Sequence, residues 1–309
     1  MIRAMLCSVL VAVLVASGCA RSQTDSTRPD RVASRGPDLS GYGRLRSPGG
    51  PSPSSTSLAE SRGIDEAQRL IDDGLYDQAR ARLDALVAQG SRHPQVFSLQ
   101  AQLAYQQGDA EIAIPWCDRA IEASPLWIEP RIILAHCYVR VKRLAAAASV
   151  FEDLDRIAPD SPWGPYGMGV IAAMRGDTVG AASLLDRALG READHAPSLE
   201  ARANLARMVQ DVGLEERLLG RYVAVEPSSA AAHARLGELA LGAGRRDDAR
   251  RWLERAYALD PQPAVARQLA ELARHRSDAA AVRLWSQRGG VAPSPANGDA
   301  GAGDRPRAK

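Results

Sequence analysis

Residues 236–261 read LGELALGAGRRDDARRWLERAYALDP, and small residues mark fixed points along this stretch. Gly237 comes first, Gly244 follows it by seven residues, Ala249 comes five residues later, and Pro261 closes the stretch. A glycine between two apolar segments indicates a turn, and a proline disfavours helical geometry in the residue before it. The stretch therefore predicts two helices joined by a turn at Gly244 and ended by Pro261.

The same points recur upstream at a period of 34 residues. The small residue of the second helix gives the series Ala79, Ala113, Ala147, Ala181 and Ala249, with Glu215 in the remaining place. The small residue of the first helix gives Ala67, Ala101, Ala135, Gly169, Ala203 and Gly237. An internal period of this length indicates a stack of similar structural units.

Three further series follow the same period. The turn position holds Gly74, Gly108, Gly176 and Gly244, with Lys142 and Gln210 in the two remaining places. The closing position holds Pro125, Pro159, Pro227 and Pro261. An apolar position in the second helix holds Leu83, Cys117, Phe151, Leu185, Leu219 and Leu253. The fifth copy departs from the pattern at Glu215, and we expect a distorted turn there at Gly213.

These interlocked series resemble the tetratricopeptide repeat, a pair of antiparallel helices of 34 residues. The resemblance covers about residues 60–263. It implies an all-α fold, an α-solenoid of about six helix pairs with a C-terminal capping helix or two at 264–287. Composition agrees, because the chain of 309 residues holds 55 Ala, the best helix former, and only 5% aromatic residues.

The N-terminus predicts export and lipid attachment. The apolar stretch from Met5 to Ala16 is too short to span a bilayer and suits a signal peptide. Residues 15–19, Val-Ala-Ser-Gly-Cys, resemble the lipobox of bacterial lipoproteins, although Ala16 stands where leucine is commonest. The resemblance implies a signal peptide over 1–18, a lipid on Cys19, and a place on the periplasmic face of the outer membrane. The alternatives are a plain secretory peptide or a short uncleaved anchor.

Composition divides the rest of the chain. Residues 19–58 are rich in Ser, Arg, Pro and Gly, which predicts a disordered tether, and residues 288–309 predict a disordered tail. The solenoid with its cap occupies 59–287. Residues 60–287 hold 28 basic and 32 acidic residues, a net charge of −4. This charge argues against nucleic acid as a partner, because neutralisation of phosphates dominates such binding.

Motifs for catalysis and for bound cofactors are missing from the sequence. The five histidines include no pair at i+3 or i+4, and there is no Gly-Lys dipeptide of a phosphate-binding loop and no GxSxG motif. A nucleotide-binding loop follows a β-strand, whereas no strand is expected before the glycine-rich run 164–169. The sequence therefore predicts a protein that is not an enzyme, with no cofactor, no metal and no small-molecule substrate.

The resemblance also implies where a partner binds. In tetratricopeptide proteins a concave face, lined by fixed positions of each first helix, takes an extended peptide or a partner helix. Carried to this sequence, the candidate groove residues are Gln102, Tyr105, His136, Arg140, Trp163, Tyr166, Asn204 and Arg207. They combine aromatic surface with hydrogen-bond donors, as in recognition hot spots. The alternative is that they are ordinary residues of the helix surfaces.

Two cysteines lie within the repeats. Cys117 and Cys137 belong to helices that should pack together, so they are a candidate disulfide in an oxidising compartment. The alternative is that Cys117 fills the core position held elsewhere by Leu or Phe.

The architecture favours a non-catalytic adaptor that is held at the bacterial cell envelope by its lipid and grips a protein partner. It resembles the repeat lipoproteins that assist assembly of type IV or tight-adherence pili and their secretin pores. A scaffold that recruits peptidoglycan hydrolases or proteases, and a component of polysaccharide export, are the alternatives.

Overall fold

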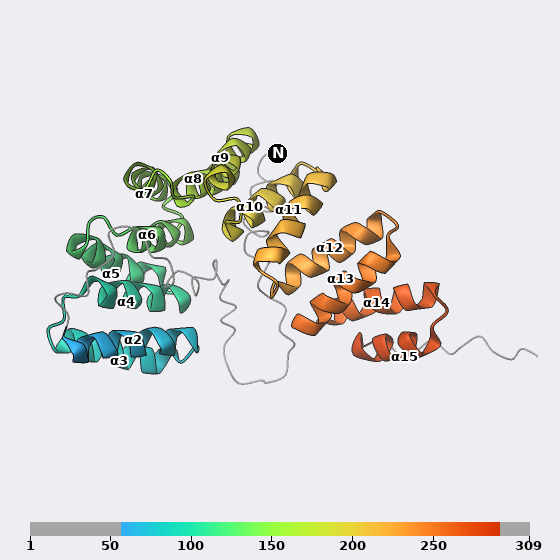
Figure 1. The fold of residues 1–309 in the computed structure, drawn as a ribbon, viewed down its shortest axis with the longest axis horizontal. Coiled ribbons are helices and arrows are strands. Elements are labelled where there is room, and N and C mark those ends of the chain that lie inside the picture. Colours follow the sequence, from blue (N-terminus) through green and yellow to red (C-terminus); the bar gives the residue numbers. More distant parts are fainter. Residues whose placement is uncertain (1–56, 291–309) are drawn as a thin grey trace, which may run out of the picture. The chain divides into compact units, whose positions relative to one another are not determined.

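The computed structural model describes residues 57–290, and every regular element within this range is an α-helix (Figure 1). The predicted signal peptide, Cys19, and nearly all of the predicted tether and tail lie outside the described residues. The first described helix begins at Leu58 and the last ends at Arg288, each one residue beyond the predicted bounds of the solenoid. The all-α prediction is confirmed.

The helices form successive pairs, and the chain divides into two compact units at the connection that holds Pro227. Unit 1 ends at Val225 and contains α2 (Leu58–Asp72), α3 (Tyr76–Ala88), α4 (Pro94–Gln106), α5 (Ala110–Ala123), α6 (Glu129–Arg140), α7 (Leu144–Ile157), α8 (Trp163–Met174), α9 (Thr178–Arg191), α10 (Ala196–Met208) and α11 (Val212–Val225). Unit 2 begins at Glu226 and contains α12 (Ala230–Gly242), α13 (Arg246–Leu259), α14 (Pro263–His275) and α15 (Ala279–Arg288). In unit 1 the pairs follow one another along a curve, with α6, α8 and α10 toward its inner side (Figure 1).

One backbone conformation ends the first helix of each pair. The glycines of the turn series, such as Gly74 and Gly244, have φ between 73° and 94°. Lys142 and Gln210, the two exceptions in sequence, have the same left-handed conformation, each with φ of 60°. A residue with a Cβ pays steric strain in this region, which is why glycine is usual here. The turn geometry is thus common to the repeats, whichever residue occupies it.

The fifth pair keeps this geometry, so the distortion expected at Gly213 is wrong. Its turn is made by Gln210, and Gly213 lies in the first turn of α11, which begins at Val212. Glu215, in place of the usual alanine, is buried with 2% of its surface exposed. The helix ladder continues through it because its backbone N–H donates to the carbonyl of Asp211 at 2.9 Å. A change of side chain at this point therefore leaves the backbone unaltered.

The small residues of the repeat lie where helix axes approach closely. Ala147 in α7 and Ala249 in α13 are fully buried. At the corresponding point of the first helices, a Cβ added to Gly169 would come within 2.9 Å of Leu185, and one added to Gly237 within 2.7 Å of Leu253. Close packing of this kind depends on the absence of side-chain volume.

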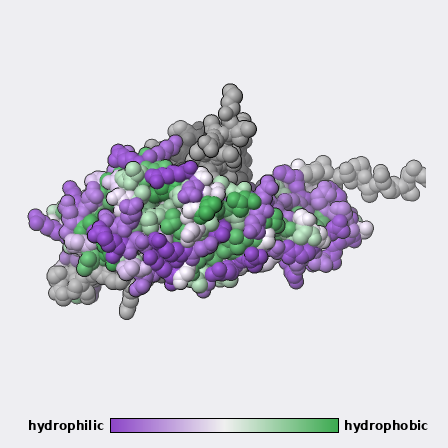
Figure 2. All heavy atoms as spheres, turned by 90° about the horizontal axis from the view of Figure 1, so that it is seen from above, coloured by the Kyte–Doolittle hydropathy of each residue, from purple (hydrophilic) through white to green (hydrophobic). Residues whose placement is uncertain are grey.

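Ion pairs add contacts between neighbouring pairs of unit 1. Asp155 in α7 accepts from Arg187 at 2.9 Å and from Arg191 at 2.6 Å, both on α9. Arg143 pairs with Glu111 across 3.1 Å in the same way. Since most of these groups are partly exposed, each pair contributes little to stability. The face seen in Figure 2 carries many hydrophilic residues, with hydrophobic patches among them.

Candidate partner-binding surface

An aromatic cluster lies at the centre of unit 1, built from three successive first helices and the residue that precedes a fourth. Its members are Tyr105 on α4, His136 on α6, Trp163 and Tyr166 on α8, and His195 before α10, with Phe151 of α7 beneath them. Every member is buried, with at most 7% of its surface exposed. The cluster therefore fastens the second, third, fourth and fifth pairs to one another.

Most ring pairs in this cluster meet edge to face, whereas His136 is tilted by 53° against Tyr105 and by 51° against Tyr166. The centroid of Trp163 lies 4.4 Å from that of His195 and 5.5 Å from that of Tyr166, with the planes nearly perpendicular. The His136 ring lies 6.0 Å from Phe151 and 6.4 Å from Trp163, also near perpendicular. Perpendicular aromatic pairs at these distances are favourable beyond the area that they bury.

Glycines in α8 explain how the cluster fits. The run 164–169, which is rich in glycine, packs closely against neighbouring helices. A Cβ on Gly164 would lie 2.8 Å from the backbone of Asp155, and one on Gly167 would lie 2.2 Å from the ring of Phe151. The close approach of α8 to α7 brings Trp163 into its position beside the imidazoles. The run is thus a packing feature.

Two imidazole nitrogens in the cluster have no hydrogen-bond partner in the described structure. They are Nε2 of His136 and Nε2 of His195, both buried. The other ring nitrogen of His195, Nδ1, lies 2.7 Å from the hydroxyl of Ser198, which is itself fully buried. A buried polar atom without a partner is costly and needs an explanation.

Burial also sets the titration of the cluster. It lowers the pKa of His136 to about 4, and the nearby Arg140 guanidinium acts on this pKa in the same direction. Burial alone lowers the pKa of His195 to about 4. It raises the pKa of Tyr166, with Glu200, Tyr105 and Tyr222 adding to the rise. At neutral pH both imidazoles are therefore uncharged.

The structure places the candidate groove residues in the same region of unit 1, but five are buried and three are partly exposed. Gln102 is buried, as are Tyr105, His136, Trp163 and Tyr166 of the cluster. Arg140, Asn204 and Arg207 are partly exposed. The five buried side chains lie beneath the inner face, and the other three are accessible at its surface. His195 also belongs to the cluster, but the sequence does not indicate it. The residue precedes α10 as its N-cap, and its spacing does not show that the ring packs against Trp163 and Tyr166.

The partly exposed residues form an inner strip along α6, α8 and α10. The strip consists of Val139 and Arg140, then Val170, Ala173 and Met174, then Asn204, Arg207 and Met208. They share a face because they recur at 34-residue spacing, as in Val139, Ala173 and Arg207. Several of the apolar members pack on the core beneath them. The strip therefore offers apolar surface with polar groups at both ends.

The polar ends of the strip differ in how they are held. Arg140 donates from Nη1 to the carbonyl oxygen of Tyr105 at 3.0 Å, and its guanidinium carbon lies 4.0 Å from the centroid of the Tyr105 ring. The remaining donors of this group are thus held in a fixed orientation. The side chains of Asn204 and Arg207 make no hydrogen bond or ion pair with the described residues.

Cys117 in α5 and Cys137 in α6 are both fully buried, and both thiols are free in the structure. Burial raises the pKa of Cys117, and a hydrogen bond with Cys137 raises it further, so the two sulfur atoms are neighbours. Cys117 fills the core position held by Leu83 and Phe151 in other pairs, as one of the two sequence interpretations has it. Whether an oxidant joins the thiols stays a prediction.

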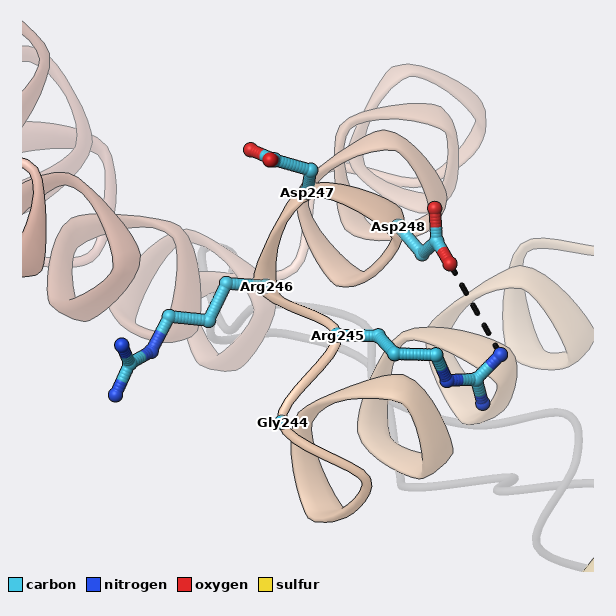
Figure 3. Close-up of a pocket in the computed structure, with 5 residues that line it drawn as sticks. All are labelled: Gly244, Arg245, Arg246, Asp247 and Asp248. Atoms are coloured by element: carbon cyan, nitrogen blue, oxygen red, sulfur yellow. Dashed lines mark ion pairs between the residues drawn. The ribbon is translucent and has the colours of Figure 1, made fainter.

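Unit 2 presents a hollow at the turn between α12 and α13, lined by Gly244 to Asp248 (Figure 3). Arg245 and Asp248 face each other there across 3.9 Å, whereas Arg246 extends away from them. Five consecutive residues of one turn line this hollow, so it is a feature of the repeat and carries no functional assignment. Within residues 57–290 no cluster of His, Cys, Asp or Glu suits a metal ion, and none of the helices has the length and apolar character to cross a membrane.

Comparison with known proteins identifies the repeat. The model of a tetratricopeptide repeat family matches residues 64–126 and 216–264. These two segments match tetratricopeptide repeats, and the described residues form an α-solenoid of helix pairs. Repeats of this kind are protein-interaction scaffolds. The comparison with curated proteins gives no match.

Among solved structures, one with a TM-score above 0.5 supports the fold. A chain of the APC/C hetero-tetramer Cut9–Hcn1 is similar with a TM-score of 0.56 and 13% identity, over 72% of this chain and 44% of that one. This chain thus spans less than half the length of that neighbour. A thermophilic tetratricopeptide protein of Thermus thermophilus gives a TM-score of 0.47 and 19% identity, over 62% of this chain and 99% of that one. PilW, a type IV pilus biogenesis factor, gives 0.49 and 17%, over 63% and 91%.

Proposed function

We propose that this protein is a non-catalytic adaptor whose inner strip on α6, α8 and α10 binds a segment of a partner protein. The observation that carries the proposal is the strip itself, an apolar surface of partly exposed side chains with Arg140 at one end and Asn204 and Arg207 at the other. Apolar contact area framed by hydrogen-bond donors is typical of protein-binding surfaces.

The geometry favours an extended segment or one helix of the partner. The strip crosses the first helices of three successive pairs at equivalent positions, so a ligand lying along it meets one helix after another. The backbone carbonyls and acidic side chains of such a ligand suit the donors of Arg140, Asn204 and Arg207.

A photo-crosslinking amino acid at Asn204 tests the location, with the same group at the exposed Glu152 of α7 as the matched control. We expect a specific adduct at Asn204 and none at Glu152, both in cells and with the purified partner. In the purified pair, Arg207→Ala should weaken binding about tenfold or more, the loss of one charged hydrogen bond. Equal labelling at both positions would show that the strip is not the binding surface.

Within this function we propose attachment to the bacterial envelope through a lipid on Cys19, with a partner in the assembly of a pilus or of another envelope complex. The lipobox-like residues 15–19 support the attachment. Cys19→Ser should move the protein from the membrane fraction to the soluble fraction. A secretin or pilus subunit captured at Asn204 would support assembly. A hydrolase, a protease or a glycan synthase would support the alternative scaffolds.

A further inference from the structure

We propose that His136 and His195 form an acid-sensitive latch, in which protonation of the imidazoles opens the aromatic cluster that holds the pairs of unit 1 together. The observation behind it is the pair of unpartnered Nε2 atoms within one packed cluster. Neither atom serves the scaffold by hydrogen bonding, and an apolar ring would fill the same space.

The surroundings of His136 oppose a positive charge. Tyr105 of α4, Phe151 of α7, and Trp163 and Tyr166 of α8 surround its ring at centroid distances of 6.0–6.4 Å. The charged group that acts on it is Arg140, one turn further along α6, and this charge is also positive. Glu129, in the first turn of α6, is a buried acid of the same helix.

The surroundings of His195 are similar. Trp163 and Tyr166 of α8 meet its ring edge to face, and its Nδ1 faces the Ser198 hydroxyl. Glu200 is the acidic side chain of α10 near this part of the cluster, where it acts on Tyr166. A proton on either imidazole thus places a positive charge in a site that is shielded from water, and for His136 it also stands beside the positive charge of Arg140.

The direction with pH follows from linkage. The folded imidazoles hold their proton only below a pKa of about 4, whereas those of an unfolded chain bind it below about 6.5. The unfolded state therefore binds more protons between these values, and the folded state loses stability as pH falls through this window. The shift corresponds to roughly a 300-fold change in the unfolding equilibrium constant for each imidazole.

Opening of the cluster would change the inner strip through the contact between Tyr105 and Arg140. Arg140 is held by the carbonyl and ring of Tyr105, and Tyr105 is a member of the cluster. Loss of the cluster would release this guanidinium and separate α4 from α6 and α8. Release of a bound partner by acid rests on the proposed function, whereas the latch itself does not.

Two measurements on the full chain without a partner test the latch. Imidazole NMR signals, assigned with the single variants His136→Phe and His195→Phe, should titrate well below pH 5, together with loss of the shifted aromatic signals of Trp163. Urea unfolding between pH 7 and 4 should depend less steeply on pH in the double variant than in the natural protein. His275→Gln, at an exposed position on α14, is the matched control and should leave the pH profile unchanged.

Titration of both imidazoles near pH 6.5 in a folded protein with an unchanged Trp163 signal would overturn the proposal. So would a double variant with the same pH profile as the natural protein. If the variants fail to fold, the NMR titration of the natural protein still decides. These results are independent of the crosslinking experiment, since no partner is present.

Discussion

Units 1 and 2 are built from similar helix pairs, yet the side chains packed between their pairs differ in chemistry. In unit 1, aromatic rings, two cysteines and two unpartnered imidazoles lie between the pairs. In unit 2, the buried core consists of Ala, Leu and Val, and the aromatic rings of Trp252, Tyr257 and Trp285 are only partly buried against it. Its buried histidine, His233, has Nδ1 2.8 Å from the carbonyl oxygen of Ser229. The repeat thus specifies a backbone arrangement, whereas the side chains between neighbouring pairs vary from one pair to the next. The unpartnered imidazoles and the buried thiols lie in unit 1, which also carries the inner strip.

The largest difference should appear at glycines. Gly167→Ala would place a Cβ 2.2 Å from the Phe151 ring, and we expect it to lower the free energy of unfolding by about 3 kcal/mol. Gly237→Ala in unit 2 would place a Cβ 2.7 Å from the side chain of Leu253, farther than the Phe151 ring lies from position 167, and should cost about 1 kcal/mol. Gly190→Ala, with open space around it, is the control and should stabilise by about 0.5–1 kcal/mol. Urea unfolding with hydrogen exchange assigns each effect to its unit, and equal costs at Gly167 and Gly237 would remove the contrast.

Cys117 and Cys137 lie where the second helix pair packs against the third, and a disulfide between them would stabilise unit 1. If an oxidant of the thiol–disulfide exchange class joins Cys117 and Cys137, the loop of about 20 residues should stabilise unit 1 by about 3 kcal/mol. Intact mass and thiol labelling of the unreduced, denatured protein detect the bridge, and Cys117→Ser is the control. Two reactive thiols after oxidation would assign Cys117 to core packing alone.

Alanine positions test what the units share. Ala147→Leu and Ala249→Leu enlarge equivalent, fully buried residues of α7 and α13. Each should lower the free energy of unfolding by ~1–3 kcal/mol through overpacking. Thermal melting measures both. No change at either site would mean that the 34-residue register is misplaced there.

The smallest effect is expected at the turns. Lys142→Gly and Gln210→Gly in unit 1 relieve the left-handed strain of a residue with φ of 60°, as does Ser277→Gly, with φ of 58°, in unit 2. Because glycine also loses more entropy on folding, the gain should be about 0.5–1 kcal/mol. Gly176→Ala is the reverse control, and it should destabilise. A loss of stability in the glycine variants would show that their side chains hold the turns.

Much of the fold could be predicted from residue types at fixed spacing. The alanine series marks buried contacts, the turn series marks left-handed backbone, and each closing proline follows a helix end by two residues, as Pro159 follows Ile157. The division after Val225 and the regular turn at Gln210 could not be predicted, because each depends on packing that adjacent residues do not show.

The sequence by itself determined the repeat and the position of its helix pairs, and the resemblance to tetratricopeptide repeats implied the face on which a partner binds. The repeat and the helix positions depend on local propensity and on a period that a single chain displays. Only the tertiary structure decided that Tyr105, His136 and Trp163 turn inward and leave Arg140, Asn204 and Arg207 at the surface. The same helix position is buried or exposed according to the bulk of its neighbours on other helices, and here the missing side chain of Gly167 brings α8 close enough to α7 for the rings to pack.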